Sequence, residues 1–379
     1  MNNSLWFNLV TGLFSFRKGN MRNLNLRRII MVCLFLPIFL INLLINRIFL
    51  ALDYLFYPEF LSQKIIKPVF IIAAPRSGTT FLFHKLAFNS GKFTCFKLWE
   101  IVFAPSVIQK YFYISFFRLD AWIGGPIKKL ILYSEKLIFS KLSNIHLIGL
   151  SLPEEDEPVL LWSLSSAYLN FFYPDSDFFD DYLLFDKALA LKFKKMIMDQ
   201  YLRYLKRHAF VFNRNCEKQF LSKNPIMMGK IESLYQIFPD ALVLNINRCP
   251  KETIPSSIQL INRLFGLFTS IKGGTAVNSK IKNLLINWYE MAENALSNIH
   301  PQNLLRINFK KLVRHDETEI NQICSFLSLD TEMFLNGRNT ESSDKVHVSS
   351  NKYSKLSELE LNAVLEKLTH LKSYCHEHA

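Results

Sequence analysis

Acidic residues are missing from the start of this 379-residue chain, where no Asp or Glu occurs before Asp53. The same segment carries six basic residues: Arg17, Lys18, Arg22, Arg27, Arg28 and Arg47. Over the whole chain 45 Lys and Arg outnumber 32 Asp and Glu, a net charge of +13. Such an excess favours anionic partners such as a nucleotide, a membrane surface or nucleic acid. Because much of it lies beside a strongly apolar stretch, the charge points to a membrane surface, and we expect no nucleic-acid partner.

Paired cysteines are also missing. The six cysteines are widely separated, and none has the short spacing of zinc sites or redox motifs: Cys33, Cys95, Cys216, Cys249, Cys324 and Cys375. The sequence therefore implies no metal. Half of the residues are hydrophobic, so the chain does not need a disulfide to fold, and we expect buried, reduced thiols.

Residues 29 to 45 are nearly all apolar, and the apolar pattern continues to Phe56. The clean run is slightly shorter than the roughly 20 residues that a membrane span needs. Asn42, Asn46 and Asp53 recur at near-helical spacing, as one polar stripe would. Three interpretations remain open: a single span with a cytoplasmic N-terminus, a helix lying in the membrane interface, or a helix packed on the protein's own core. No small-residue cleavage site follows the run, which disfavours a signal peptide.

Apolar runs alternate with helical patterns along the rest of the chain. We predict buried strands at 69 to 74 and 241 to 247, shorter strands at 220 to 225 and 304 to 309, and helices at 107 to 150, 159 to 169, 186 to 208, 228 to 237, 251 to 264, 280 to 299, 316 to 328 and 354 to 373. This order predicts an α/β fold with a parallel sheet flanked by helices. We expect an N-terminal membrane-associated segment over 1–59 and one catalytic domain over 60–379.

The loop from 75 to 80, Pro-Arg-Ser-Gly-Thr-Thr, connects the first buried strand to a helix. Such a turn directs free backbone NH groups and the positive end of the helix dipole at one point, which suits a phosphate or sulfate. Arg76 adds a positive charge, and Ser77, Thr79 and Thr80 add hydroxyl groups. The loop is not a Walker A motif, because Thr79 follows Gly78 where that motif has Lys.

A second anion-binding pair follows the strand at 241 to 247. Arg248 lies at the end of this strand, and Ser256 comes eight residues later, directly after Pro255, which is expected to distort the helix. The carboxyl ends of parallel strands meet at one edge of a sheet, where ligands bind. We therefore expect Arg248 and Ser256 to hold one phosphate near the first loop.

These two elements resemble those of sulfotransferases that use 3'-phosphoadenosine 5'-phosphosulfate (PAPS), and the likeness covers roughly residues 65 to 355. The branch that it resembles contains tyrosylprotein, carbohydrate and many bacterial sulfotransferases. Further similar segments are 99 to 105, 153 to 157, 223 to 225, 238 to 240, 308 to 313 and 347 to 353. The chain departs from the family pattern at Cys249, where relatives usually have an acid or amide, and at 308 to 312, which lacks the family's acids.

The resemblance implies a sulfotransferase fold of P-loop-like type and a role for individual residues. Arg76, Ser77, Gly78, Thr79 and Thr80 would bind the 5'-phosphosulfate of PAPS, and Arg248 and Ser256 its 3'-phosphate. Lys223 would support the transition state, and direct in-line transfer needs no metal.

The base that accepts the proton of the acceptor stays open between several residues. Glu100 lies in apolar surroundings that should raise its pKa into a useful range. Glu155 and Asp156 are rivals within the acidic cluster 153 to 157, and His84 and His146 are weaker candidates.

The expected activity is transfer of a sulfuryl group from PAPS to a hydroxyl or amine of an unidentified acceptor, which could be a lipid, a carbohydrate or a protein. The alternative is a kinase-like or non-catalytic P-loop nucleotide-binding membrane protein. The missing Walker Lys argues against a kinase. We expect a bacterial, membrane-associated protein whose catalytic domain faces the cytoplasm.

Overall fold

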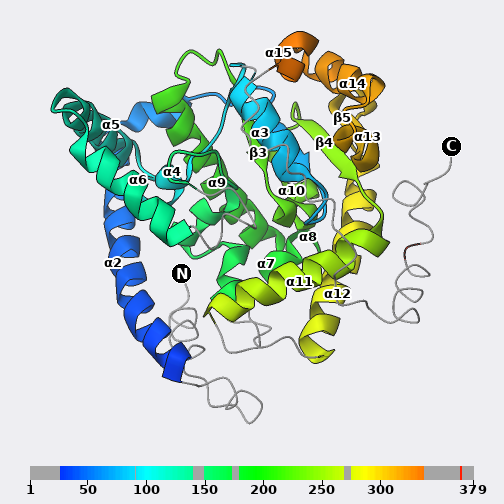
Figure 1. Ribbon diagram of the computed structural model, residues 1–379, viewed down its shortest axis with the longest axis horizontal. Helices are drawn as coiled ribbons and strands as arrows, with labels where there is room; N and C mark the ends of the chain where they lie inside the picture. Colours follow the sequence, from blue (N-terminus) through cyan, green and yellow to red (C-terminus); the bar gives the residue numbers. More distant parts are fainter. Residues whose placement is uncertain are drawn as a thin grey trace.

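A parallel sheet of five strands organises the computed structural model, in which residues 26–89, 91–139, 149–172, 179–268, 275–336 and 368 are described (Figure 1). The strand order is β2-β3-β1-β4-β5. The strands are β1 (Val69–Ile72), β2 (Phe93–Thr94), β3 (Gln219–Lys223), β4 (Leu242–Asn247) and β5 (Leu304–Asn308). All neighbouring pairs are parallel. This confirms the predicted α/β fold with helices on the sheet.

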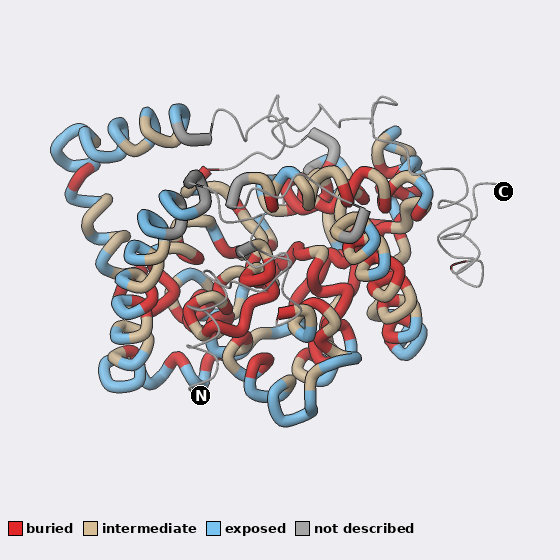
Figure 2. Tube along the Cα trace, turned by 90° about the horizontal axis from the view of Figure 1, so that it is seen from below, coloured by how far each residue is buried: buried red, intermediate tan, exposed pale blue. Residues whose placement is uncertain are grey.

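The central strand β1 is buried on both faces, as its unbroken apolar sequence predicts. Phe70 and Ile72 belong to one hydrophobic core and Val69 and Ile71 to another, because successive side chains of a strand point to opposite faces. Figure 2 shows that the buried parts of the chain lie at the centre of the molecule.

Helices cover both faces of the sheet. The core of Val69 and Ile71 includes residues of α3 (Thr79–Asn89) and α14 (Glu317–Leu327). The core of Phe70 and Ile72 includes residues of α9 (Leu191–Phe212), α10 (Ile231–Ile237), α11 (Pro250–Phe268) and α12 (Thr275–Leu296). Shorter helical elements are η2 (Pro58–Ser62), α7 (Asp180–Leu183), α8 (Phe185–Ala188), η5 (Pro225–Gly229), η6 (Pro301–Asn303), α13 (Phe309–Val313) and α15 (Thr331–Asn336).

The N-terminal apolar sequence forms the long helix α2 (Leu26–Phe56). Its part from Cys33 to Phe56 is long and apolar enough to cross a membrane, and only 11% of the most apolar window is buried. It contacts α4 (Leu98–Phe103) and α5 (Val107–Trp122), and α6 (Pro126–Phe139) packs on α5 (Figure 1). The helical segment predicted at 107 to 150, with a break at Gly124, Gly125 and Pro126, forms α5 and α6, and the break lies where predicted, at Gly124 and Gly125, which both have positive φ.

Two further predictions are wrong in detail. The segment expected to be one helix from 159 to 169 forms the 3-10 helices η3 (Glu157–Ser163) and η4 (Ala167–Phe172), because Leu164 adopts a left-handed conformation that ends the first. Of the described cysteines only Cys324 is buried, whereas Cys33 is exposed on α2. The expected helix at 354 to 373 lies outside the described residues, apart from Leu368.

Candidate functional site

The loop between β1 and α3 has the shape of an anion cradle. Arg76 and Gly78 both have positive φ, 68° and 77°, which lets the backbone turn sharply before α3 begins at Thr79. Ser77 is 1% exposed, and its hydroxyl has no hydrogen-bond partner in the described structure. A buried hydroxyl without a partner costs free energy, and a bound oxyanion would supply its acceptor.

Gly78 cannot be replaced by a larger residue without a shift of the surrounding structure. A Cβ atom at this position would lie 2.9 Å from a ring carbon of Phe309, the first residue of α13. The same ring packs against Arg248, whose guanidinium carbon is 4.0 Å from the ring centroid. Phe309 therefore contacts both predicted anion-binding elements, and its sequence position gave no signal to predict this.

The two elements are in direct contact with each other. Arg248 Nη1 donates to the carbonyl oxygen of Arg76 at 2.6 Å, and Arg76 Nε donates to Ser256 Oγ at 3.1 Å. Ser257 adds a third link by donating to the carbonyl oxygen of Pro75 at 3.1 Å. The structure thus brings Arg76, Arg248 and Ser256 together at the carboxyl edge of β1 and β4, where a parallel sheet binds ligands.

Arg248 is held in place before any ligand arrives. Glu252, in the first turn of α11, accepts from Arg248 Nε at 3.0 Å and from Arg248 Nη2 at 2.8 Å. The side chain of Arg248 is 11% exposed and that of Glu252 38% exposed. The ion pair leaves the arginine partly accessible and fixes its direction toward the loop.

On the other side of β1, Lys223 ends strand β3 in register with Ile71. Its Nζ lies 2.6 Å from Glu155 Oε1, and its side chain is 1% exposed against 19% for Glu155. The hydroxyl of Tyr168 donates to the other oxygen of Glu155. Burial, with a further contribution from Glu155, raises the pKa of Tyr168 well above its usual value, so the phenol stays protonated.

Asp156 points in another direction from its neighbour Glu155. It is 1% exposed and accepts a hydrogen bond from Tyr201 on α9. Burial raises the pKa of Asp156 to about 6, even though the bond from Tyr201 opposes the shift. Glu157, next along the chain, is equally buried and pairs with Lys230 at 2.5 Å.

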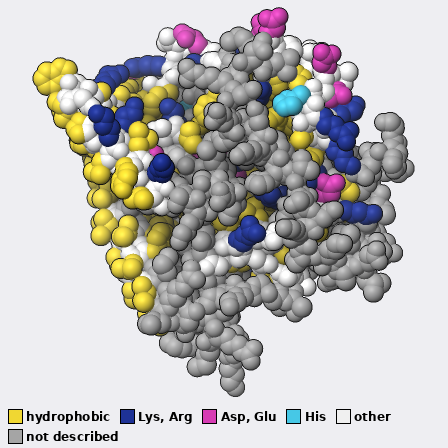
Figure 3. Space-filling view, in the orientation of Figure 1, with side chains coloured by type: hydrophobic (Ala, Val, Ile, Leu, Met, Phe, Trp, Pro, Cys, Tyr) yellow, Lys and Arg dark blue, Asp and Glu magenta, His cyan; other side chains and the backbone are white. Residues whose placement is uncertain are grey.

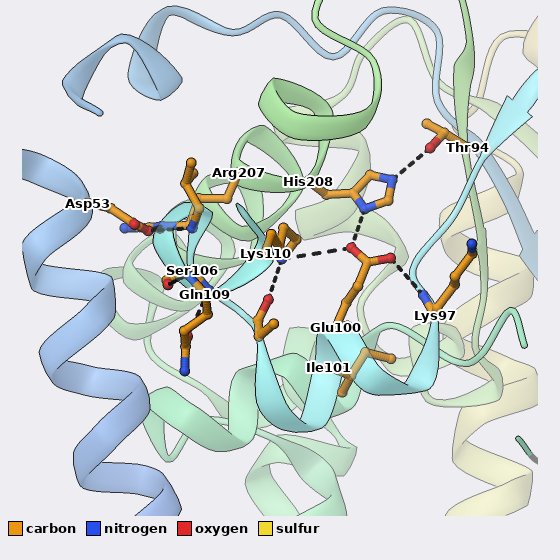
Figure 4. Close-up of polar contacts among 12 residues, drawn as sticks. Asp53, Thr94, Lys97, Glu100, Ile101, Ser106, Gln109, Lys110, Arg207 and His208 are labelled. Carbon is orange, nitrogen blue, oxygen red and sulfur yellow. Dashed lines mark hydrogen bonds and ion pairs between the residues drawn. The ribbon is translucent and has the colours of Figure 1, made fainter. Parts of the chain in front are cut away.

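Glu100 belongs to a closed polar network, which Figure 4 shows. It is 1% exposed and contacts His208 Nδ1 at 2.8 Å, the backbone N of Lys97 at 3.1 Å and Lys110 Nζ at 3.8 Å. His208 contacts Thr94 through its other nitrogen, at 2.7 Å.

The expectation of a raised pKa at Glu100 is wrong. Burial alone would raise it, but the charges of His208 and Lys110 and the hydrogen bonds of His208 and Lys97 together lower the pKa below its ordinary value. Burial lowers the pKa of Lys110 to about 8. Apolar sequence around Glu100 predicted burial correctly, but it did not show that His208, 108 residues away, would lie within hydrogen-bonding distance.

The polar stripe of α2 faces the protein. Asp53 accepts from the backbone N of Val107 and of Ile108 at the start of α5, at 3.0 and 3.1 Å, and pairs with Arg207 at 2.7 Å (Figure 4). Asn46 accepts from Gln109 at 2.7 Å. Asn42 donates to the carbonyl oxygen of Val102 at 3.0 Å. The C-terminal half of α2 is therefore bonded to α4, α5 and α9.

The remaining candidates do not join the site. His84 is buried within α3 and packs between Phe83 and Phe88. His146 and the segment 347 to 353 lie outside the described residues. Within the described residues no group of His, Cys, Asp and Glu side chains could hold a metal ion.

The structure has a parallel sheet flanked by helices, with the two predicted anion-binding elements at one edge. The chain belongs to the sulfotransferase family, whose model matches residues 68–333. The family confirms the resemblance read from the sequence, and with it the assignment of the chain as a sulfotransferase whose family uses PAPS as donor.

Relatives and solved structures agree with this assignment. Over 296 residues the chain is 24% identical to the omega-hydroxy-beta-dihydromenaquinone-9 sulfotransferase Stf3 of Mycobacterium bovis and of Mycobacterium tuberculosis, covering 76% of this chain and 69% of each relative. The solved sulfotransferase STF1 of Mycobacterium tuberculosis has a TM-score of 0.70 at 16% identity and covers 97% of this chain and 91% of its own. The solved sulfotransferase STF9 of Mycobacterium avium has a TM-score of 0.67 at 17% identity, and the match covers 89% of this chain and 84% of STF9. These structures establish the fold.

Proposed function

We propose that this chain transfers the sulfuryl group of PAPS to a hydroxyl group of a membrane lipid. The observation that carries the donor assignment is the direct contact between the loop of Arg76 and the pair Arg248 and Ser256. Two cationic, hydroxyl-bearing elements that touch each other suit a ligand with two separate anionic groups. A 3',5'-bisphosphate nucleotide has that charge pattern.

The loop residues supply the site for the 5'-phosphosulfate. Arg76 contributes charge, Ser77 a buried hydroxyl in need of a partner, and Thr79 and Thr80 hydroxyls at the N-terminus of α3. Gly78 allows the close backbone approach. Arg248 and Ser256 receive the 3'-phosphate, and Glu252 already holds the guanidinium of Arg248 through two of its nitrogens.

Lys223 and Glu155 form the centre that acts on the acceptor. PAPS supplies the sulfuryl group, whose bond to the 5'-phosphate oxygen breaks as a bond to the acceptor oxygen forms. Glu155 accepts the acceptor's proton, and Lys223 and Arg76 offset the negative charge that remains on the departing phosphate. Tyr168 holds the carboxylate of Glu155 in place through its other oxygen.

Accessibility favours Glu155 over the two other carboxylates. Its side chain is 19% exposed, whereas Glu100 and Asp156 are each 1% exposed. A general base must reach the acceptor's proton directly or through one water. Asp156 is the next candidate for the general base, because its pKa of about 6 suits proton transfer. We assign Glu100 a positioning role within its closed network.

A lipid acceptor is supported by the apolar N-terminal helix and by the relatives, whose name states that they act on a hydroxylated menaquinone. We place the enzyme at a bacterial membrane with its catalytic domain in the cytoplasm. The N-terminal segment holds it there, and no nucleic acid or metal takes part.

The test uses radiolabelled PAPS, the purified chain and a bacterial lipid extract. We expect label in the organic phase, with transfer lost in Glu155→Gln while PAP, the product of PAPS, still binds. Glu100→Gln, at a carboxylate that is only 1% exposed, is the control and should lower transfer far less than Glu155→Gln at a temperature where both variants are folded. The same assay in a whole bacterial extract provides the opposite outcome: label only in protein or carbohydrate would overturn the lipid assignment. Phosphate transfer from labelled ATP would favour the kinase-like alternative.

A further inference from the structure

Three helices expose an unusual amount of apolar surface on one side of the molecule. On α2 the side chains of Leu34, Ile38 and Leu44 are 63%, 66% and 62% exposed. At the C-terminal end of α5 Trp122 is 84% exposed, and on α6 Leu130 is 64% exposed. Figure 3 shows hydrophobic side chains, in yellow, along the left edge of the molecule, the side on which α2, α5 and α6 lie in Figure 1. We call the exposed sides of these three helices the apolar face.

The apolar face has basic but no acidic exposed side chains. The three helices contain Asp53, Asp120 and Glu135 as their only acids. Asp120 accepts from the backbone N of Ile127 and of Lys128 at 2.9 and 3.0 Å, and Glu135 accepts from that of Leu150 at 2.5 Å. All three acids are therefore engaged with backbone NH groups of the protein itself.

Exposed cations remain around the apolar surface on α5 and α6: Arg118, Lys128, Lys129 and Lys136. Figure 3 shows dark blue side chains among the yellow ones at the upper left. A surface that combines large apolar side chains with unopposed positive charge is complementary to an anionic lipid bilayer.

The contacts of α2 determine how it meets the membrane. Asn42, Asn46, Arg47 and Asp53 all bond to the catalytic domain, including the bond from Arg47 Nε to the carbonyl oxygen of Trp162 at 3.1 Å. A spanning α2 would carry the pair of Asp53 and Arg207, and the domain helices around it, into hydrocarbon. A helix that lies in the interface keeps them on the aqueous side.

We infer that the apolar face is a membrane-binding surface that lies on one leaflet of an anionic bilayer, with α2 in the interface and the α5–α6 turn inserted beside it. This deepens the membrane association proposed above. It extends that association from the N-terminal helix to α5 and α6, and it selects the interfacial over the spanning arrangement.

Vesicle flotation tests the surface without any enzymatic step, so its outcome is separate from that of the sulfuryl-transfer assay. The full chain is mixed with vesicles of phosphatidylcholine alone or of phosphatidylcholine mixed with the anionic lipid phosphatidylglycerol. We expect Lys128→Glu with Lys129→Glu to weaken binding to the anionic vesicles by about 10- to 30-fold. The control with the same charge change is Lys311→Glu with Arg314→Glu, two exposed positions on and after α13, and it should bind as the wild type does.

Fluorescence locates the inserted turn. Vesicles that carry a lipid quencher near the headgroup should quench part of the tryptophan emission of the wild type. In Trp122→Phe the vesicles should no longer cause this quenching, because the tryptophan near the lipid is absent. Equal binding of both double variants, or quenching unchanged in Trp122→Phe, contradicts the inference. The inference is also overturned if the wild type does not float with vesicles and forms a dimer without lipid that Leu130→Asp converts to a monomer. The apolar face would then be an interface between two copies of the chain.

Discussion

Replacing Gly78 by Ala should lower both the stability of the protein and its affinity for PAP, and the two effects can be measured separately. The left-handed backbone of Gly78 costs about 1–2 kcal/mol for any residue with a Cβ. The new methyl would lie 2.9 Å from the Phe309 ring, and such overpacking costs about 1–3 kcal/mol. The free energy of unfolding should therefore fall by about 2–5 kcal/mol, which lowers Tm by roughly 3–6 °C for a chain of this length. Because Phe309 also supports Arg248, PAP affinity should fall at least about tenfold.

Two other glycines separate these effects. Gly91 has φ +61° with nothing within 4 Å of an added Cβ, so Gly91→Ala measures the backbone cost alone. Gly266 has neither a positive φ nor a close neighbour, and Gly266→Ala in α11 should be neutral or slightly stabilising. Differential scanning fluorimetry with and without PAP compares all three. If Gly78→Ala matches Gly91→Ala in Tm and keeps its affinity for PAP, Phe309 does not brace the loop.

Three further predictions follow from buried charges. Lys223→Met should lower kcat by about 10²–10³-fold with the Kd of PAP nearly unchanged, and a loss in single-turnover assays below tenfold contradicts its role. Asp53→Asn leaves Arg207 buried without its ion partner and should lower the free energy of unfolding in urea by about 3–5 kcal/mol; a loss under 1 kcal/mol would refute the anchoring of α2. The pKa of Asp156 is raised to about 6, so its contribution to stability is present below about pH 4 and lost as pH rises to 6. Asp156→Asn should remove that decline, about 3 kcal/mol, from urea titrations across this pH range.

The sheet could be predicted from the sequence because its central strands are continuous apolar runs. Val69 and its neighbours read as a buried strand, and they form one with neighbours on both sides. The two-residue strand β2 is too short to give a periodic signal, and its pairing with β3 depends on contacts more than 100 residues apart. The ends of η3 could not be predicted either, since they depend on the backbone conformation of Leu164.

The candidate site was predictable where chemistry resides in short motifs. The loop of Arg76 and the spacing from Arg248 to Ser256 pointed to two anion sites before their contact was known. Glu100 shows the limit of this reasoning. Its apolar neighbours indicated burial, but the sign of its pKa shift depends on His208 and Lys110, which only the fold brings near. Tyr168 and Phe309 were missed because nothing in the local sequence distinguishes them from core aromatics.

The polar stripe of α2 illustrates the same limit. Asn42, Asn46 and Asp53 predicted that one side of the helix is polar. They did not show whether that side faces water, lipid headgroups or the protein. The structure shows that this side contacts the protein and that the apolar side is exposed. An apolar helix with its polar side buried cannot be told from an ordinary amphipathic helix by periodicity, because the period is the same.

The measurement that tests the central claim most directly is a calorimetric titration of the purified chain with PAP and with ATP. We expect PAP to bind at least about 100-fold more tightly, because Arg248 and Ser256 receive a 3'-phosphate that ATP lacks. Ser256→Ala should reduce that preference about tenfold, whereas Ser297→Ala, at an exposed position, should leave it unchanged. ATP binding as tightly as PAP, or a preference unaffected by Ser256→Ala, would contradict the bipartite site.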